Sequence, residues 1–227
     1  MPYYGRRTNY RRRRRVYRRR RAPRSRGTIY GAAARQLYKD VSKLKSMINV
    51  EYKYHDFSFT DNSVTTTPVT TTVNLVNEGD TDQTHDGAMF RMKSIQLEGS
   101  VQLGSASPPH IARMVLVLDT DSSAVSSAPT YNDVYDNTGT ITNRLRNLDN
   151  RSRFIILKEW NWFLQPNGRE GTRFSWYRQL DLKTQIVGSA TQANLKKNGL
   201  YLMYVSDSSA ANNIVLDVTS RIRYIDN

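Results

Sequence analysis

The first 27 residues hold thirteen arginines and neither a lysine nor an acidic residue. The rest of the chain carries 21 lysines and arginines against all 20 acidic residues, so nearly all of the formal net charge of +14 belongs to this amino-terminal segment. Such a segment cannot fold alone, because its like charges repel and it has little apolar surface to offset the entropy lost on ordering. We therefore expect residues 1–27 to be a disordered arm, and the fold to lie in the remainder.

The composition of this arm predicts binding to nucleic acid. A guanidinium group holds two phosphate oxygens at once, and guanidinium groups and tyrosine rings both stack on unpaired bases. The candidate contact residues are Arg6, Arg7, Arg11, Arg12, Arg13, Arg14, Arg15, Arg18, Arg19, Arg20, Arg21, Arg24, Arg26, Tyr10 and Tyr17. The two runs Arg11–Arg15 and Arg18–Arg21 are also typical of a nuclear localisation signal.

Residues 28–49 are the expected connection between the arm and the body. Their apolar residues recur at spacings of four, three and four, and most of their cations lie off this stripe. The stripe consists of Leu37, Val41, Leu44 and Ile48. This pattern favours a basic amphipathic helix, with an extended connector as the alternative.

From residue 50 to residue 227, the apolar residues mostly repeat with a period of two, which indicates β-strands. The clearest half-buried strand is Ile95–Leu103, and the continuous apolar run Met114–Leu118 predicts a strand buried on both faces. Further strands are expected near residues 50–59, 73–76, 153–164, 174–186, 200–205 and 214–224. Eight or nine strands without alternating helices predict an antiparallel two-sheet sandwich.

Four local features add detail to this prediction. The apolar phase changes after Tyr54, which predicts a bulge or bend at His55–Asp56. Thr65–Thr72 is expected to be an exposed connection that leads into a strand at Val73–Val76. The polar segment 119–150 is expected to contain one helical turn near Tyr131, and the Pro-Asn-Gly sequence at 166–168 predicts a turn.

The sequence contains no catalytic or cofactor motif. Its three histidines, His55, His85 and His110, form neither an HxH nor an HExxH pattern. The absence of cysteine excludes thiol nucleophiles, disulfides and thiolate metal sites, and no GxSxG, P-loop or GxGxxG sequence is present. We therefore expect neither an enzyme nor a cofactor site.

Two acidic groups have the oxygen ligands that calcium prefers. Asp80, Asp82 and Asp86 lie in one polar segment, and Asp119 and Asp121 follow a predicted strand. Their spacing matches no calcium-binding loop. The interpretation that we prefer is that these acids keep the outer surface of the body from competing with the arm for nucleic acid.

No apolar run approaches the roughly 18 residues typical of a membrane-spanning helix. No apolar segment typical of a secretory signal follows the basic start. We therefore expect no membrane insertion, and the absence of cysteine fits folding in a reducing compartment.

The order of the motifs resembles the capsid proteins of small circular single-stranded DNA viruses, the circovirus-like group that also encodes a replication initiator. The resemblance is carried by RRRRRVYRRRR and VEYKYHD, and by RMKSIQLEGSVQL, RMVLVLDT, RFIILKEW and SRIRYIDN in this order. It implies an eight-stranded antiparallel jelly roll, a closed icosahedral shell of about sixty copies, packaging of the genome, and nuclear import through the arm. The segment Leu37–Ile48 is also similar to coats of satellite plant viruses, which package RNA.

Together these observations predict a viral capsid subunit, found in the virion and, during assembly, in the host nucleus. Its expected partners are about sixty copies of itself, a single-stranded genome (with DNA favoured over RNA) and host import receptors. Sixty inward-pointing arms would bring on the order of 780 positive charges to the phosphates of that genome. The alternatives are a non-viral or RNA-binding β-sandwich module with a cationic arm, a satellite-type RNA virus coat, and a sugar-binding sandwich.

Overall fold

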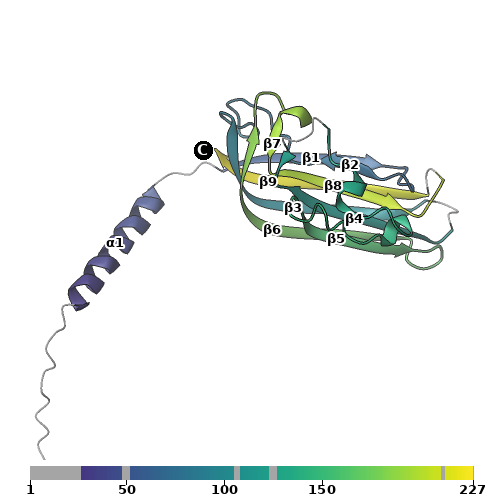
Figure 1. Ribbon diagram of the computed structural model, residues 1–227, viewed down its shortest axis with the longest axis horizontal. Coiled ribbons are helices and arrows are strands. Elements are labelled where there is room, and N and C mark those ends of the chain that lie inside the picture. Colours follow the sequence, from purple (N-terminus) through teal and green to yellow (C-terminus); the bar gives the residue numbers. More distant parts are fainter. Residues whose placement is uncertain (1–26, 48–51, 105–107, 123–126, 211–212, 227) are drawn as a thin grey trace, which may run out of the picture. The chain divides into compact units, whose positions relative to one another are not determined.

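The computed structural model describes residues 27–47, 52–104, 108–122, 127–210 and 213–226 (Figure 1). The chain divides into two units, residues 1–49 and 50–227. Among the described helices, none is both long enough and apolar enough to cross a membrane.

The described part of the first unit is the helix α1, Gly27–Met47. Three alanines in its first half favour a helix, and the side chain of Gln36 donates a hydrogen bond to Asp40 one turn later, at 3.0 Å. The described residues of the apolar stripe, Leu37, Val41 and Leu44, are all exposed. The helix therefore presents apolar side chains and cations to solvent together.

The described residues of the second unit form nine strands in two antiparallel sheets, which Figure 1 labels along the body. The first sheet has the order β1-β9-β3-β6-β7, with β1 Lys53–Asp61, β9 Ile214–Asp226, β3 Met89–Leu103, β6 Gly171–Ile186 and β7 Leu195–Lys197. The second has the order β2-β8-β4-β5, with β2 Val69–Thr72, β8 Gly199–Ser206, β4 His110–Asp119 and β5 Phe154–Leu164. Short helical turns lie at α2 Tyr131–Val134, η2 Ile141–Asn143 and η3 Gln192–Asn194.

The strand order is that of a jelly roll. Apart from the three-residue β7, the first half of the body pairs with the second half in reverse order: β1 with β9, β2 with β8, β3 with β6, and β4 with β5. Rolling up such a paired ribbon produces two four-stranded sheets that face each other, which is the jelly-roll arrangement. The prediction of an all-β, eight-stranded antiparallel jelly roll is confirmed, with β7 as an addition at the edge of the first sheet.

The main core lies between the two sheets. Ile95, Leu97 and Val101 of β3 are fully buried there, as the period-two pattern predicted. From the opposite sheet, Met114 and Leu116 of β4 enter the same core. Burying each such side chain contributes roughly 1.5–3 kcal/mol of transfer free energy, so the alternating residues of these two strands account for much of the stability.

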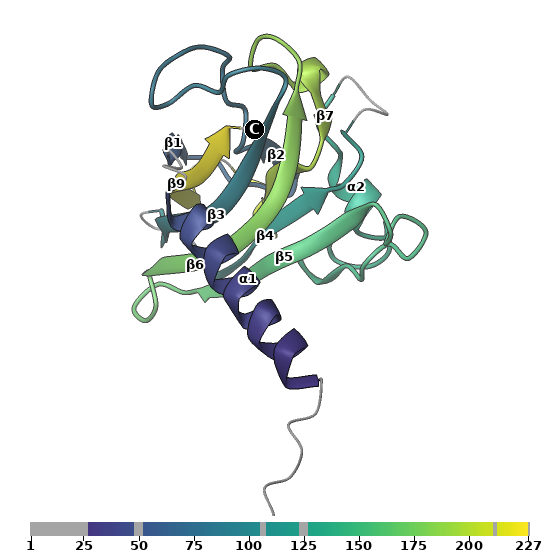
Figure 2. The ribbon, with the colours of Figure 1, turned by 90° about the vertical axis from the view of Figure 1, so that its left-hand side faces the viewer.

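A second, smaller core covers the outer face of the β2-β8-β4-β5 sheet. Val115 and Val117 of β4 belong to it together with residues of α2, so β4 is buried on both faces as predicted. Figure 2 shows α2 beside the sheet that contains β4 and β5. The same layer contains a buried arginine, Arg113, which donates hydrogen bonds to the backbone carbonyls of Thr142 and Arg144 at 3.2 and 3.0 Å. These contacts anchor the segment between β4 and β5 to the sheet.

The predicted bulge at His55–Asp56 is wrong. Strand β1 pairs with β9 without interruption from Lys53 to Asp61, whereas β3 is bulged against β9 between Met92 and Ser94. The apparent phase change in β1 has another cause, because Tyr54 lies on the outer face whereas Phe57 packs against the core.

The strand predicted at Val73–Val76 is also misplaced. Strand β2 lies within the threonine run, at Val69–Thr72, and the buried residues that follow it have no strand conformation. The buried side chain of Asn74 takes the place of a backbone partner, because it accepts a hydrogen bond from the Leu200 amide at 2.8 Å and donates one to the Asn198 carbonyl at 3.0 Å. The turn at 166–168 and the helical turn at Tyr131 are confirmed.

Candidate nucleic-acid interface

The arginines and tyrosines predicted to contact nucleic acid, Arg6 through Arg26 with Tyr10 and Tyr17, lie outside the described residues. The same holds for the predicted nuclear localisation signal. The assignment of these residues therefore stays a prediction from sequence. Within the described residues, a second group of tyrosines and cations gathers on the body.

This group occupies the outer face of the β1-β9-β3-β6 sheet. On β9, Ile222 and Tyr224 face the core, so the alternating Arg221 and Arg223 face outward. On β1, the outward residue Tyr54 lies directly across from Arg223. On β6, Tyr177 occupies the same outer face, because it lies opposite Gln96 of β3. Strand alternation thus places tyrosines and arginines side by side.

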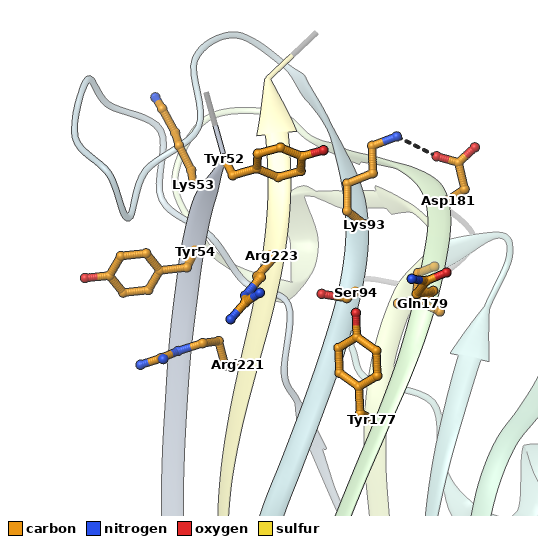
Figure 3. Close-up of a pocket in the computed structure, with 11 residues that line it drawn as sticks. Tyr52, Lys53, Tyr54, Lys93, Ser94, Tyr177, Gln179, Asp181, Arg221 and Arg223 are labelled. Carbon is orange, nitrogen blue, oxygen red and sulfur yellow. Dashed lines mark hydrogen bonds and ion pairs between the residues drawn. The ribbon is translucent and has the colours of Figure 1, made fainter. Parts of the chain in front are cut away.

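A hollow of about 860 Å³ opens on this face (Figure 3). Four of its lining residues are cationic and one is acidic. The lining consists of Tyr52, Lys53, Tyr54, Lys93, Ser94, Tyr177, Gln179, Leu180, Asp181, Arg221 and Arg223. Figure 3 shows Tyr52 lying across β9 and the hydroxyl of Tyr177 directed toward Ser94.

One side of the hollow is formed by a fixed arrangement of Tyr54, Arg221 and Asp56. The Arg221 guanidinium lies 5.3 Å from the centre of the Tyr54 ring and donates two hydrogen bonds to the Asp56 carboxylate, at 2.7 and 2.6 Å. Hydrogen bonding from Arg221 lowers the pKa of Asp56, against a smaller opposing effect of burial. The guanidinium is thereby held in one orientation at the β1 side of the face.

On the other side, Asp181 of β6 holds two cations of β3. The ammonium of Lys93 donates to its carboxylate at 2.9 Å, and Arg91 donates to its second oxygen. Hydrogen bonds from Lys93 and then Arg91 lower the pKa of Asp181. Between these two fixed groups lies Arg223, whose guanidinium has no hydrogen-bond or ion-pair partner among the residues that the structure describes.

Tyr52 is the first described residue of the body, and it lines the hollow. The site was not predicted from the sequence, because Tyr52 and Tyr54 were counted with the apolar residues of their strand. The alternation of arginine with apolar residues in RIRY, at 221–224, was the available signal.

The histidines and the candidate calcium ligand Asp119 do not form a metal site among the described residues. Asp119, a candidate calcium ligand, accepts two hydrogen bonds from Arg153, both at 2.8 Å. The described residues contain no group of three histidine or acidic side chains arranged to hold a metal ion. His55, His85 and His110 lie on three different elements, respectively β1, the loop before β3, and the start of β4.

The solved structures that resemble this chain include the following two. A structure of Desmodium yellow mottle tymovirus matches it over 77% of this chain and 87% of its own, with 13% identity and a TM-score of 0.36. The capsid protein of beak and feather disease virus, crystallised as a 60-mer, matches over 77% of this chain and 90% of its own, with 10% identity and a TM-score of 0.29. These structural neighbours are viral coat and capsid proteins. No protein-family model and no curated protein sequence matches the chain.

Proposed function

We propose that the chain is a viral capsid subunit, which assembles into a closed shell of about sixty copies and packages a single-stranded genome through its arginine-rich arm. The observation that carries this proposal is the attachment of thirteen arginines in 27 residues to a jelly roll of almost zero net charge. Jelly rolls occur in viral capsids, lectins and cupins. Of these three classes of protein, only the capsid, which encloses a polyanionic genome, has a use for a polycationic arm.

The separation of charge also suits assembly. Bodies that each carry 17 lysines and arginines against 19 acidic residues, a net charge of −2 over residues 50–227, can pack side by side with little mutual repulsion. The arms, in contrast, repel one another when they are collected in one cavity, unless phosphates neutralise them. Assembly and packaging are therefore coupled: the genome supplies the counter-charge that allows the arms to be concentrated on the inside of the shell.

The mechanism of packaging is the release of counterions from phosphates, with stacking of tyrosine and arginine on unpaired bases. If all thirteen arginines engage single strands, the logarithm of the affinity falls with the logarithm of the salt concentration with a slope of up to roughly −9 per arm. The proposal extends to DNA as the preferred genome and to import into the host nucleus through the arm. Both extensions rest on the sequence resemblance.

Electron microscopy of the purified full-length protein tests the central claim. We expect uniform closed particles that protect co-purified nucleic acid from nuclease, and sequencing of that nucleic acid identifies it as DNA or RNA. A variant lacking residues 1–26 is expected to remain folded and to lose the nucleic acid. Monomers that bind oligonucleotides would support a non-assembling module instead, and a salt slope near zero would exclude packaging by the arm.

A further inference from the structure

We propose that the hollow on the outer face of the β1-β9-β3-β6 sheet is a second binding site, which holds a short stretch of single-stranded nucleic acid against the body. The inference rests on the proposed function, because it supposes the same polymer that the arm binds. It assigns to the folded body a contact that sequence analysis placed only in the arm.

The aromatic side chains of the hollow suit unpaired bases. Tyr52 is 65% exposed and Tyr177 is 54% exposed, so both present ring faces to solvent at the hollow. Exposed rings on a sheet surface are the platform on which proteins stack single-stranded bases, and this stacking tolerates any sequence. Bases within a duplex are already stacked and paired, so the hollow favours single strands.

The cations of the hollow suit the phosphates that connect such bases. Arg223 lies at the centre of the face, directly across from Tyr54 on one side and Ser94 on the other, and has no partner of its own among the described residues. Arg221 and Lys93 flank it, each held in place by a carboxylate. A guanidinium without an internal partner binds a phosphate without first breaking an ion pair, so Arg223 is the expected first contact.

A sulfated glycan would also be attracted by these cations, but it has no aromatic face to cover the tyrosine rings. The presence of the arginine-rich arm in the same chain favours nucleic acid as well. Because the arm and the hollow belong to one chain, a polymer bound by the arm is held near the body at high effective concentration. The two sites then act on the same strand.

Photochemical cross-linking of the full-length chain tests this inference. The probe is a thymidine oligonucleotide that carries 5-iodouracil, irradiated with the protein at moderate salt. Cleavage after acidic residues separates the two sites, because it releases the arm with residues 28–40 as one fragment, 1–40, and the two tyrosine regions as the fragments 52–56 and 171–181. We expect cross-links in fragment 1–40 and in at least one of the other two.

Variants assign the cross-links to the hollow. Arg223→Gln is expected to lower cross-linking of the fragments 52–56 and 171–181 about fivefold or more, and to leave that of fragment 1–40 unchanged. Arg173→Gln is the matched control. It also removes one positive charge from the outer face of the sheet, but Arg173 lies on β6 and does not line the hollow. Tyr177→Phe is expected to retain the cross-links, whereas Tyr177→Ala is expected to lower those of fragment 52–56 as well, since a base between the two rings loses one of them.

The outcomes distinguish this inference from the function on which it rests. Cross-links confined to fragment 1–40 overturn the inference and leave packaging by the arm intact. The absence of cross-links from every fragment contradicts nucleic-acid binding altogether. The inference is also wrong if the fragments 52–56 and 171–181 carry no cross-link to the oligonucleotide while a heparin octasaccharide slows chemical nitration of their tyrosines. In that case the ligand of the hollow is a sulfated glycan.

Discussion

The guanidinium carbon of Arg113 lies 4.0 Å from the centre of the Tyr135 ring, in the small core that covers the second sheet. The same guanidinium forms an ion pair with Glu159 at 2.8 Å and donates to the hydroxyl of Tyr131 at 3.2 Å. A single side chain of β4 thus connects the sheet, α2 and the long segment before β5. Its removal should affect all of them together.

We expect Arg113→Met to lower the free energy of unfolding by about 3 kcal/mol, because it removes the cationic partner of Glu159 and the donor to two loop carbonyls while the cavity stays filled. Thermal unfolding of the full-length chain at fixed protein concentration measures the change. Arg173→Met, at an exposed position, is the control and should change stability by less than about 0.5 kcal/mol. Equal effects of the two variants would show that Arg113 is not an anchor.

Gly99, in the middle of β3, is expected to tolerate no side chain. A Cβ at this position would lie 2.1 Å from the backbone carbonyl oxygen of Asp217 and 2.7 Å from the ring of Phe174. Gly99→Ala should therefore destabilise the body by about 3 kcal/mol or more, since a backbone atom on the neighbouring strand cannot easily move away. Ser100→Ala on the adjacent outward position is the control, and similar melting temperatures for both variants would refute the close approach.

The stability of the body should fall below neutral pH through His55. Burial lowers the pKa of His55, and the nearby Asp56 opposes the shift only in part. The unfolded chain then binds the proton more readily than the folded one, so this contribution is complete above about pH 6.5 and is lost as the pH falls through the folded-state pKa. We expect the melting temperature to decrease from pH 7.5 to pH 5 by more in the native sequence than in His55→Gln. Parallel curves would contradict the prediction.

Nuclear import is expected to depend on the two arginine runs of the arm. A fluorescent protein fused to residues 1–27 should accumulate in the nucleus of cultured cells, because clustered cations are typical of import signals. Replacement of Arg11–Arg15 and Arg18–Arg21 by glutamine should abolish the accumulation. Microscopy scores both fusions, and replacement of Arg6 and Arg7 alone serves as the control. Nuclear accumulation of the substituted fusion would remove import from the functions of these residues.

Much of the fold could be predicted because its strands alternate cleanly. Ile95 and Leu97 share one face, and the uninterrupted run around Val115 correctly predicted a strand buried on both sides. The alternation pattern did not predict which strands pair with each other, because β1 and β9 come together from opposite ends of the body. The nature of their partners decides the register, and a single strand does not contain that information.

The errors in the sequence analysis have a common physical origin. Tyrosine is both apolar and polar, so counting Tyr54 as an apolar strand residue led to the wrong prediction of a bulge, although its ring lies beside Arg221 at the surface. Asn74 is a polar residue in a buried segment, and only the structure shows that its amide replaces a strand partner. In both places, the tertiary neighbours of a side chain determined its position more strongly than its hydropathy did.

An extra layer of chain covers one of the two sheets, and this affects which parts of the sequence can vary. The segment between β4 and β5 forms an extra layer, with exposed Leu145 and Leu148, on a jelly roll whose main core lies elsewhere. Its exposed surface can therefore change in sequence at little cost to folding, so long as the carbonyls that meet Arg113 stay in place. Among the described residues of the body, no such layer covers the outer face of the other sheet, so a change there alters the sheet itself. One side of the body is therefore free to diversify in sequence, while the other is constrained by its strands.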